Sequence, residues 1–172
     1  MSDMTLRTEP HWVIVMGVSG CGKSTVAHRL ALTTGAEFLD ADDFHPAENV
    51  AKMAAGIALN DEDRAGWLRA LNQELKQKSV LGTSVFLACS ALKEKYREVL
   101  REGIDSLEFV YLKGSKELIR SRMEMRSEHF FKPELLDSQF AALEEPEVAV
   151  ILDSAQPLEL LVRKALHELR IE

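Results

Sequence analysis

The chain has 172 residues, of which 46% are hydrophobic and 28% are charged. These proportions are close to those of globular domains, and they exclude disordered, collagen-like and fibrous classes. A formal net charge of −7 argues against nucleic acid or an anionic membrane as a partner. With two cysteines and no apolar run near the roughly 20 residues of a membrane span, we expect a reduced, cytoplasmic protein.

Apolar runs of strand length alternate with helical patterns, which is typical of a parallel α/β sheet. Residues 1–11 contain no signal-peptide pattern and are expected to form a flexible leader before a single domain over residues 12–172. Strands are predicted at residues 12–18, 37–40, 84–89, 107–112 and 148–152.

Helices are predicted between these strands. The first is expected to stop at Gly35, and two more fall between the second and third strands. Of these two, Pro46 opens one that Gly56 closes, and Asn60 or Asp61 caps the longer one. Later helices are predicted around residues 92–100 and 118–123, and from Pro133 and Pro157.

Residues 17–24 read Gly-Val-Ser-Gly-Cys-Gly-Lys-Ser and match the phosphate-loop pattern G-x-x-x-x-G-K-[ST] at every position. A strand precedes the loop and a helix follows it, so main-chain N–H groups can converge on phosphate oxygens. Lys23 is expected to reach the β- and γ-phosphates, and the Ser24 hydroxyl to take a Mg²⁺ position. Nucleotide contacts are assigned to Gly17, Val18, Ser19, Gly20, Cys21, Gly22, Lys23, Ser24 and Thr25.

A phosphate loop serves GTPases, transport ATPases and small-molecule kinases, so other segments must indicate the class. The chain contains no N-K-x-D guanine-reading segment and no L-S-G-G-Q transporter signature, and it is short for a coupled machine. These features favour a small kinase that uses ATP and Mg²⁺.

Carboxylates follow the second predicted strand. Asp40 closes an apolar run at the carboxyl edge of the sheet, where it is expected to hold Mg²⁺ or its water shell. Asp42 is expected to accept a hydrogen bond from the substrate hydroxyl, as a base or an orienting group. The alternative is that both acids only solvate a loop.

Two arginines precede a segment without a helical period. Arg122 and Arg126 are spaced i, i+4, which places them on one helix face. We expect a lid over residues 122–133 whose guanidinium groups close onto the transferring phosphate. A solvated helix with ordinary surface arginines is the alternative.

The middle of the chain resembles the gluconate kinase family, and bacterial gluconokinases in particular. The resemblance is carried by a long pattern of spaced residues and extends over nearly the whole chain after the leader. The matching residues are Asp42-Asp43-Phe44-His45-Pro46, Asn49, Lys52, Met53, Gly56, Leu59, Asp61, Asp63-Arg64, Trp67-Leu68, residues 89–93, Tyr96-Arg97, residues 112–114, Arg122, Arg126, His129, Phe130, Gln139-Phe140, Leu143-Glu144 and Pro146.

The resemblance implies an adenylate-kinase-like core with parallel strand order 2-3-1-4-5. It further implies transfer of the ATP γ-phosphate to the 6-hydroxyl of D-gluconate, giving 6-phospho-D-gluconate, by a homodimeric enzyme. Asp42 would be the catalytic carboxylate, together with Lys23, Arg122 and Arg126. Residues 43–80 would form a helical insertion on the substrate side.

Gluconate offers one carboxylate and several hydroxyls, which sets the demands on its site. The planar fork of Arg64 is the first candidate for the carboxylate, and Lys93 and Arg97 are supporting cations. The residues expected to bind hydroxyls or order the loop are His45, Lys52, Ser90 and, by the resemblance, His129. Each of these could instead be a surface residue or a cap.

Two other functions remain open at this point. One is a kinase of the same fold that acts on shikimate, a nucleoside monophosphate or another sugar acid. The other is a nucleotide-sensing protein whose active site has decayed. Acceptor-dependent release of ADP separates the second from both kinases.

Overall fold

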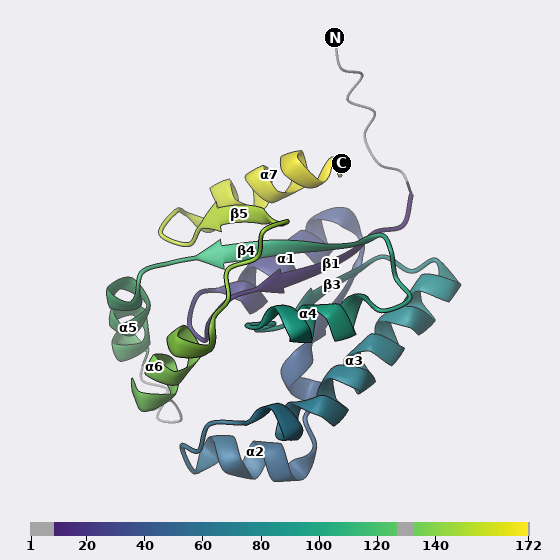
Figure 1. Cartoon of the computed structure of the whole chain (residues 1–172). Coiled ribbons are helices and arrows are strands. Elements are labelled where there is room, and N and C mark those ends of the chain that lie inside the picture. The colour runs from purple at the N-terminus through teal and green to yellow at the C-terminus, as the bar shows by residue number, and fades with distance from the viewer. Residues whose placement is uncertain (1–8, 127–132, 172) are drawn as a thin grey trace.

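The computed structural model describes residues 9–126 and 133–171. Within them, parallel strands form one sheet in the order β2-β3-β1-β4-β5 (Figure 1). The strands are β1 (Trp12–Met16), β2 (Glu37–Asp40), β3 (Val85–Ala88), β4 (Leu107–Lys113) and β5 (Val150–Asp153). The strand order and the α/β class confirm the predictions, and the predicted strand ends are wrong by at most two residues.

Helices connect the strands, as parallel pairing requires. They are α1 (Lys23–Thr34), the 3₁₀ helix η1 (Ala41–Phe44), α2 (Ala47–Ala54), α3 (Asp61–Leu81), α4 (Glu94–Arg101), α5 (Lys116–Met125), α6 (Pro133–Ala142) and α7 (Leu158–Leu169). Gly35 ends α1 in the left-handed conformation with φ of 75°, as predicted. Pro157 is the residue before α7 and not, as predicted, part of its first turn.

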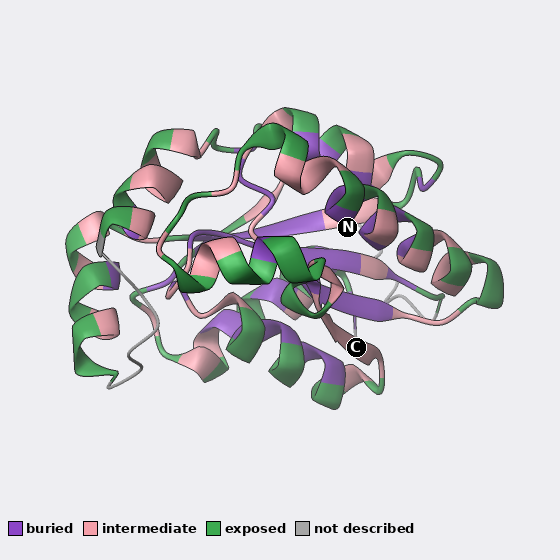
Figure 2. Ribbon diagram, turned by 90° about the horizontal axis from the view of Figure 1, so that it is seen from below, coloured by how far each residue is buried: buried purple, intermediate pink, exposed green. Residues whose placement is uncertain are grey.

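The core lies on both faces of the sheet because side chains alternate along each strand. Val13 and Val15 of β1 pack with buried residues of α1 and α7, whereas Ile14 and Met16 pack with those of α3 and α4. Figure 2 shows the result, with buried central strands between helices that are buried along one side only. No helix among the described residues is long and apolar enough to cross a membrane.

The domain begins earlier than predicted. His11 lies in the predicted leader, yet its residue is only 7% exposed and its carbonyl accepts a hydrogen bond from Val85 N at 2.9 Å. Its own N–H donates to Ser84 Oγ at 3.1 Å. Main-chain pairing beside β3 therefore fixes His11 within the fold, and residues 1–8 lie outside the described part of the chain.

A helical segment, η1, α2 and α3, is inserted between β2 and β3 (Figure 1). Its long helix α3 begins with a capping box: Asp63 N donates to Asn60 Oδ1 at 2.8 Å, and Asn60 N donates to Asp63 Oδ2 at 3.0 Å. On the side of α3 that faces the sheet, Trp67, Leu71 and Leu75 are buried. The cap thus sets where α3 starts, and burial sets which side faces the core.

Loss of this cap is expected to destabilise the protein without altering its core. Asn60→Ala leaves the Asp63 N–H without its acceptor and should lower the free energy of unfolding by about 1 kcal/mol. Urea unfolding followed by circular dichroism measures the change. Asn60→Asp keeps an acceptor and should retain most of the stability; equal losses in both variants would contradict the capping role.

Candidate active site

The phosphate loop joins β1 to α1 with the shape that its glycines permit. Gly20 and Gly22 have φ values of 80° and 97°, which L-residues with a side chain rarely adopt. A Cβ on Gly20 would lie 2.8 Å from Met123 Cγ of α5, so α5 packs directly on the loop. Cys21 turns its side chain into the core, where the residue is 1% exposed, and thus offers the loop only its main chain. This geometry suits a main-chain cradle for phosphate.

Carboxylates gather beside this loop at the end of β2. Asp40 Oδ2 accepts a hydrogen bond from Ser24 Oγ at 3.4 Å, and Asp40 Oδ1 accepts one from Asp42 N at 3.0 Å. Asp40 therefore connects the start of α1 with the turn that carries Asp42. Lys23 Nζ donates to Val18 O at 3.4 Å and so remains folded over the loop.

Ser24 and Asp40 fit a Mg²⁺ site of the kind found with nucleotides. No group of three or more His, Cys, Asp or Glu side chains placed to hold a metal occurs among residues 9–126 and 133–171. Mg²⁺ in such enzymes takes one or two protein oxygens and completes its shell with phosphate and water. A hydroxyl and a carboxylate that already meet at the phosphate loop are a suitable donor pair.

The pKa of Asp42 is raised above its ordinary value of 3.8. The surrounding protein limits hydration of the charged form, and the nearby Asp40 carboxylate adds repulsion, whereas Lys23 and His45 act in the opposite direction. The side chain is nevertheless 80% exposed, so its carboxylate is open to an incoming hydroxyl. A raised pKa at an open position suits a group that accepts a proton.

His45 supports the turn that carries Asp42. Its ring stacks on Trp67 with centroids 4.1 Å apart, and Trp67 Nε1 donates to Ala41 O at 2.7 Å. Asn49 Nδ2 donates to Asp63 O and to His45 Nδ1, which leaves the ring proton on Nε2, 3.9 Å from Asp42 Oδ1. Burial lowers the pKa of His45 below 6.5, which favours this neutral form. Trp67, which is buried in the core, therefore also holds the site.

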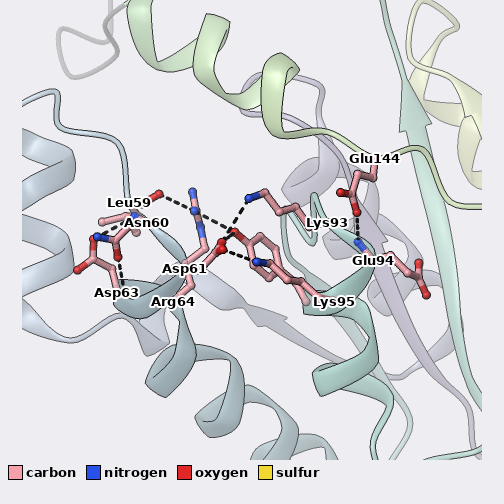
Figure 3. Close-up of polar contacts among 10 residues, drawn as sticks. Leu59, Asn60, Asp61, Asp63, Arg64, Lys93, Glu94, Lys95 and Glu144 are labelled. Atoms are coloured by element: carbon pink, nitrogen blue, oxygen red, sulfur yellow. Dashed lines mark hydrogen bonds and ion pairs between the residues drawn. The ribbon is translucent and has the colours of Figure 1, made fainter.

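A recess of about 220 Å³ lies between the start of α3, the start of α4 and α6. Its lining includes Asn60, Asp61, Arg64, Lys93 and Gln139. Figure 3 shows Lys95 of α4 and Lys93, the residue before α4, reaching toward Asp61 of α3, with Arg64 of α3 beside them. The recess thus combines cationic side chains with amide and hydroxyl groups, as a polyhydroxy acid requires.

Asp61 and Tyr96 hold the cations of the recess, and Arg64 Nη1 also donates to Leu59 O at 2.5 Å. The carboxylate of Asp61 accepts hydrogen bonds from Lys95, Tyr96 and, at 3.3 Å, Lys93, and these partners lower its pKa. The guanidinium of Arg64 lies over the Tyr96 ring, 5.4 Å from its centroid, and donates to Tyr96 Oη at 3.2 Å. The arrangement aims Arg64 and Lys93 while leaving each with unused donors.

Three other predicted substrate contacts have protein partners. Lys52 pairs with Asp63 at 2.8 Å, and the Ser90 carbonyl accepts from Gly17 N at 3.4 Å. Arg97 is 1% exposed and donates to Ala91 O, Glu144 O and Glu94 Oε2. Because Ala91 has a φ of 44°, Arg97 secures a strained turn. These contacts give Arg97 a structural role in place of the substrate contact that we predicted.

The predicted lid is only partly within the described residues. Arg122 is half-buried on α5, the helix that packs on Gly20. Arg126 lies just beyond the end of α5 in extended conformation, so the expected shared helix face is wrong. His129 lies outside the described residues, as do residues 127–132 of the lid, whose closure stays a prediction.

A larger cavity, of about 770 Å³, lies between α4, β4 and the segment before β5. Its lining includes Arg101, Phe109, Glu145 and Val148. Neither lining contains a residue of the phosphate loop or of η1, but Gln139 of the smaller recess hydrogen-bonds to Ser19 of the loop. Phosphoryl transfer requires the acceptor to meet the γ-phosphate in line. We therefore assign the acceptor to the smaller recess, on position and not on size.

Gln139 was not predicted to be a site residue. It was named only as one matching position of the family resemblance. Gln139 on α6 bonds to Ser19 of the phosphate loop, 120 positions away. No local spacing signals such a pair. Asp61 was considered as a helix cap and as a matching position of the resemblance, but not as a site residue, because an acidic residue at a helix start rarely indicates more.

Comparisons with known proteins agree with this site. Residues 19–156 match the family model described as "Shikimate kinase". The chain is 42% identical to the thermoresistant gluconokinase of Escherichia coli over 170 residues, covering 96% of this chain and 97% of that one. The fold is similar to that of a gluconokinase from Sinorhizobium meliloti, with a TM-score of 0.86 and 42% identity over 95% of this chain and 93% of that one. It is also similar to that of a sugar kinase from Janibacter, with a TM-score of 0.89 and 48% identity over 94% of this chain and 95% of that one.

A phosphate loop on a 2-3-1-4-5 sheet, with carboxylates beside it and an acceptor recess opposite, defines a P-loop small-molecule kinase. The family model spans residues 19–156, and the gluconokinases of Escherichia coli and Sinorhizobium meliloti align with at least 95% of the chain. The chain belongs to the gluconokinase family. The resemblance inferred from the spaced residues is thereby confirmed.

Proposed function

We propose that this chain transfers the γ-phosphate of ATP to the 6-hydroxyl of D-gluconate, giving 6-phospho-D-gluconate and ADP. The observation that carries the proposal is the recess that holds Arg64 and Lys93 and is joined to the phosphate loop by Gln139, in a chain with full-length similarity to gluconokinases. A carboxylate held by these cations would extend its hydroxyl chain toward Asp42. The family model named for shikimate kinase matches residues 19–156, whereas the relative that aligns with 96% of the chain at 42% identity is a gluconokinase, which favours gluconate over shikimate.

The chemistry assigns a role to each group beside the loop. The bond from the γ-phosphorus to the bridging oxygen of ADP breaks, a bond to the substrate oxygen forms, and the hydroxyl proton passes to Asp42. Ser24 and Asp40 would hold Mg²⁺, which would neutralise phosphate charge. Lys23 and the loop amides bind the phosphate chain, and Arg122 of α5 is the candidate for contact with the transferring phosphoryl group. Asp42 both orients the hydroxyl and takes up its proton.

Acceptor-dependent ADP release tests this function directly. A coupled assay with D-gluconate, a panel of other sugar acids, shikimate and AMP should give the highest kcat/KM for gluconate. Faster turnover of shikimate or AMP would overturn the choice of substrate. Binding of ATP without ADP release for any acceptor would instead support a nucleotide-sensing protein.

Arg64→Ala should weaken gluconate binding selectively. Loss of a charge-assisted hydrogen bond costs about 1.5–3 kcal/mol, so we expect the gluconate KM to rise about 10- to 100-fold, with the ATP KM nearly unchanged. Lys78→Ala is the matched control, because Lys78 is a cation on the same helix that pairs instead with Glu37 at 2.8 Å. An unchanged gluconate KM would indicate that Lys93 holds the carboxylate.

We also propose a homodimer in a reducing, cytoplasmic compartment. Both cysteines, Cys21 and Cys89, are free and buried, and burial raises the pKa of the Cys89 thiol to about 12. Such thiols are compatible with a reducing compartment. Sedimentation equilibrium of the full chain measures the oligomeric state, and a monomer at micromolar concentration would contradict the dimer.

A further inference from the structure

A side chain of α6 is bonded to the phosphate loop at both of its polar atoms. Ser19 N donates to Gln139 Oε1 at 2.7 Å, and Gln139 Nε2 donates to Ser19 Oγ at 2.8 Å. The two bonds fix the orientation of the carboxamide, because one of its atoms must accept and the other must donate. Ser19 is the third residue of the loop, next to Gly20.

Gln139 also lines the acceptor recess, together with Arg64 and Lys93. One side chain therefore contacts the phosphate loop and borders the space where we place the acceptor. The helix α6 is tied elsewhere through Asp137, whose carboxylate pairs with Lys116 at 2.6 Å and Arg120 at 3.1 Å on α5. These ion pairs hold α6 against α5 and do not involve the loop.

We propose that Gln139 is a positioning residue that sets the distance between the acceptor recess and the phosphate loop. The inference rests on the proposed function, since it concerns how gluconate meets the γ-phosphate. Gln139 acts through Ser19: the pair fixes the third residue of the loop against the wall of the recess. A neutral amide suits this position, because a carboxylate would repel both a phosphate and an anionic acceptor.

Misplacement of reacting groups by about 1 Å can cost on the order of 100-fold in rate. For Gln139→Ala we expect kcat with gluconate to fall about 10- to 100-fold. The ATP KM should change less than about 3-fold, because the loop amides other than that of Ser19 remain in place. We also expect more ADP per 6-phosphogluconate formed, since a misplaced acceptor lets water compete for the phosphoryl group.

The control is Asp137→Asn, which weakens the other tie of α6 and should leave kcat and the ratio of ADP to product near wild-type values. Gln139→Glu keeps the acceptor for Ser19 N but loses the donor. At the low end of the pH range, its kcat should lie between those of Gln139→Ala and the wild type. Ser19→Ala removes the hydroxyl, so its kcat loss should not add to that of Gln139→Ala in a double-mutant cycle.

Three results would overturn the inference: wild-type kcat in Gln139→Ala, an equal loss in Asp137→Asn, or fully additive losses with Ser19→Ala. Thermal unfolding checks that each variant folds, and if Gln139→Ala does not, the Glu variant and Ser19→Ala provide the test. Failure of the proposed function is a separate result, because wild-type enzyme would then release no ADP with gluconate. The same variants would in that event be assayed with the acceptor that the panel identifies.

Discussion

Asp42→Asn should bind ATP normally and lose about 100-fold or more in kcat. An amide at this position has nearly the same shape but cannot take up the hydroxyl proton, and general-base groups typically contribute 100- to 10,000-fold. Asp42 stands in the turn fixed by Asp40 and by Trp67, so the substitution should not move the main chain. Single-turnover kinetics with saturating ATP and gluconate measure the loss.

Asp43→Asn is the matched control, because it removes the same charge from the adjacent, exposed residue. Its kcat should remain within a few-fold of wild type. Near-normal kcat in Asp42→Asn, or equal losses in the two variants, would remove Asp42 from the catalytic role.

Asp42→Asn also allows an independent test, through the pH dependence of protein stability. A carboxyl whose pKa is raised in the folded state favours folding below its ordinary pKa of 3.8, and this contribution is lost as pH rises through the folded value. At neutral pH the ionised Asp42 therefore destabilises the free protein. Asp42→Asn should raise Tm at neutral pH, and the difference should shrink toward acidic pH. A constant difference across this range would show that the pKa of Asp42 is not raised.

Lys23→Met should lower kcat on the order of 100- to 1000-fold with every acceptor. The ammonium group lies over the loop, where charge develops on the transferring phosphoryl oxygens, and loss of one such donor typically has an effect of this size. Methionine keeps the length of the side chain without its charge. ADP release with gluconate measures the effect.

Arg29→Met serves as the control, since it removes an exposed cation from the same helix. It should turn over like wild type. If transfer persisted in Lys23→Met, the loop would not bind phosphate in the manner proposed. A loss confined to gluconate, with other acceptors unaffected, would instead assign Lys23 to the acceptor side.

The local parts of the site could be predicted from the sequence because short-range rules produce them. Glycines at 20 and 22 are required by positive φ values, Lys23 and Ser24 follow at fixed spacing, and Asp40 closes an apolar strand. Asn60 or Asp61 was predicted as the cap from its place before an apolar helix, and the capping box is formed by Asn60. In each case the cause lies within a few residues of the effect.

Long-range partners could not be predicted in this way. Arg97 was predicted to contact the substrate, but its guanidinium donates hydrogen bonds to Ala91, Glu94 and Glu144 instead. Gln139 bonds to Ser19, which lies 120 positions away in the sequence. Which donors of a cation remain free depends on every chain segment that folds against it. The residues next to a cation in the sequence therefore do not indicate how many of its donors remain free.

The sequence by itself determined the class of this protein, because a phosphate loop, its flanking strand and helix, and the alternation of apolar runs are local patterns with one stable arrangement. Only the tertiary structure decided which side chains are available for substrate. Packing brings α3, α4 and α6 together. There Asp61 bonds to Lys93, Tyr96 bonds to Arg64, and Gln139 bonds to the phosphate loop. Hydrogen bonds between distant segments form only once the sheet and its helices have closed around them, so the final assignment of roles belongs to the fold.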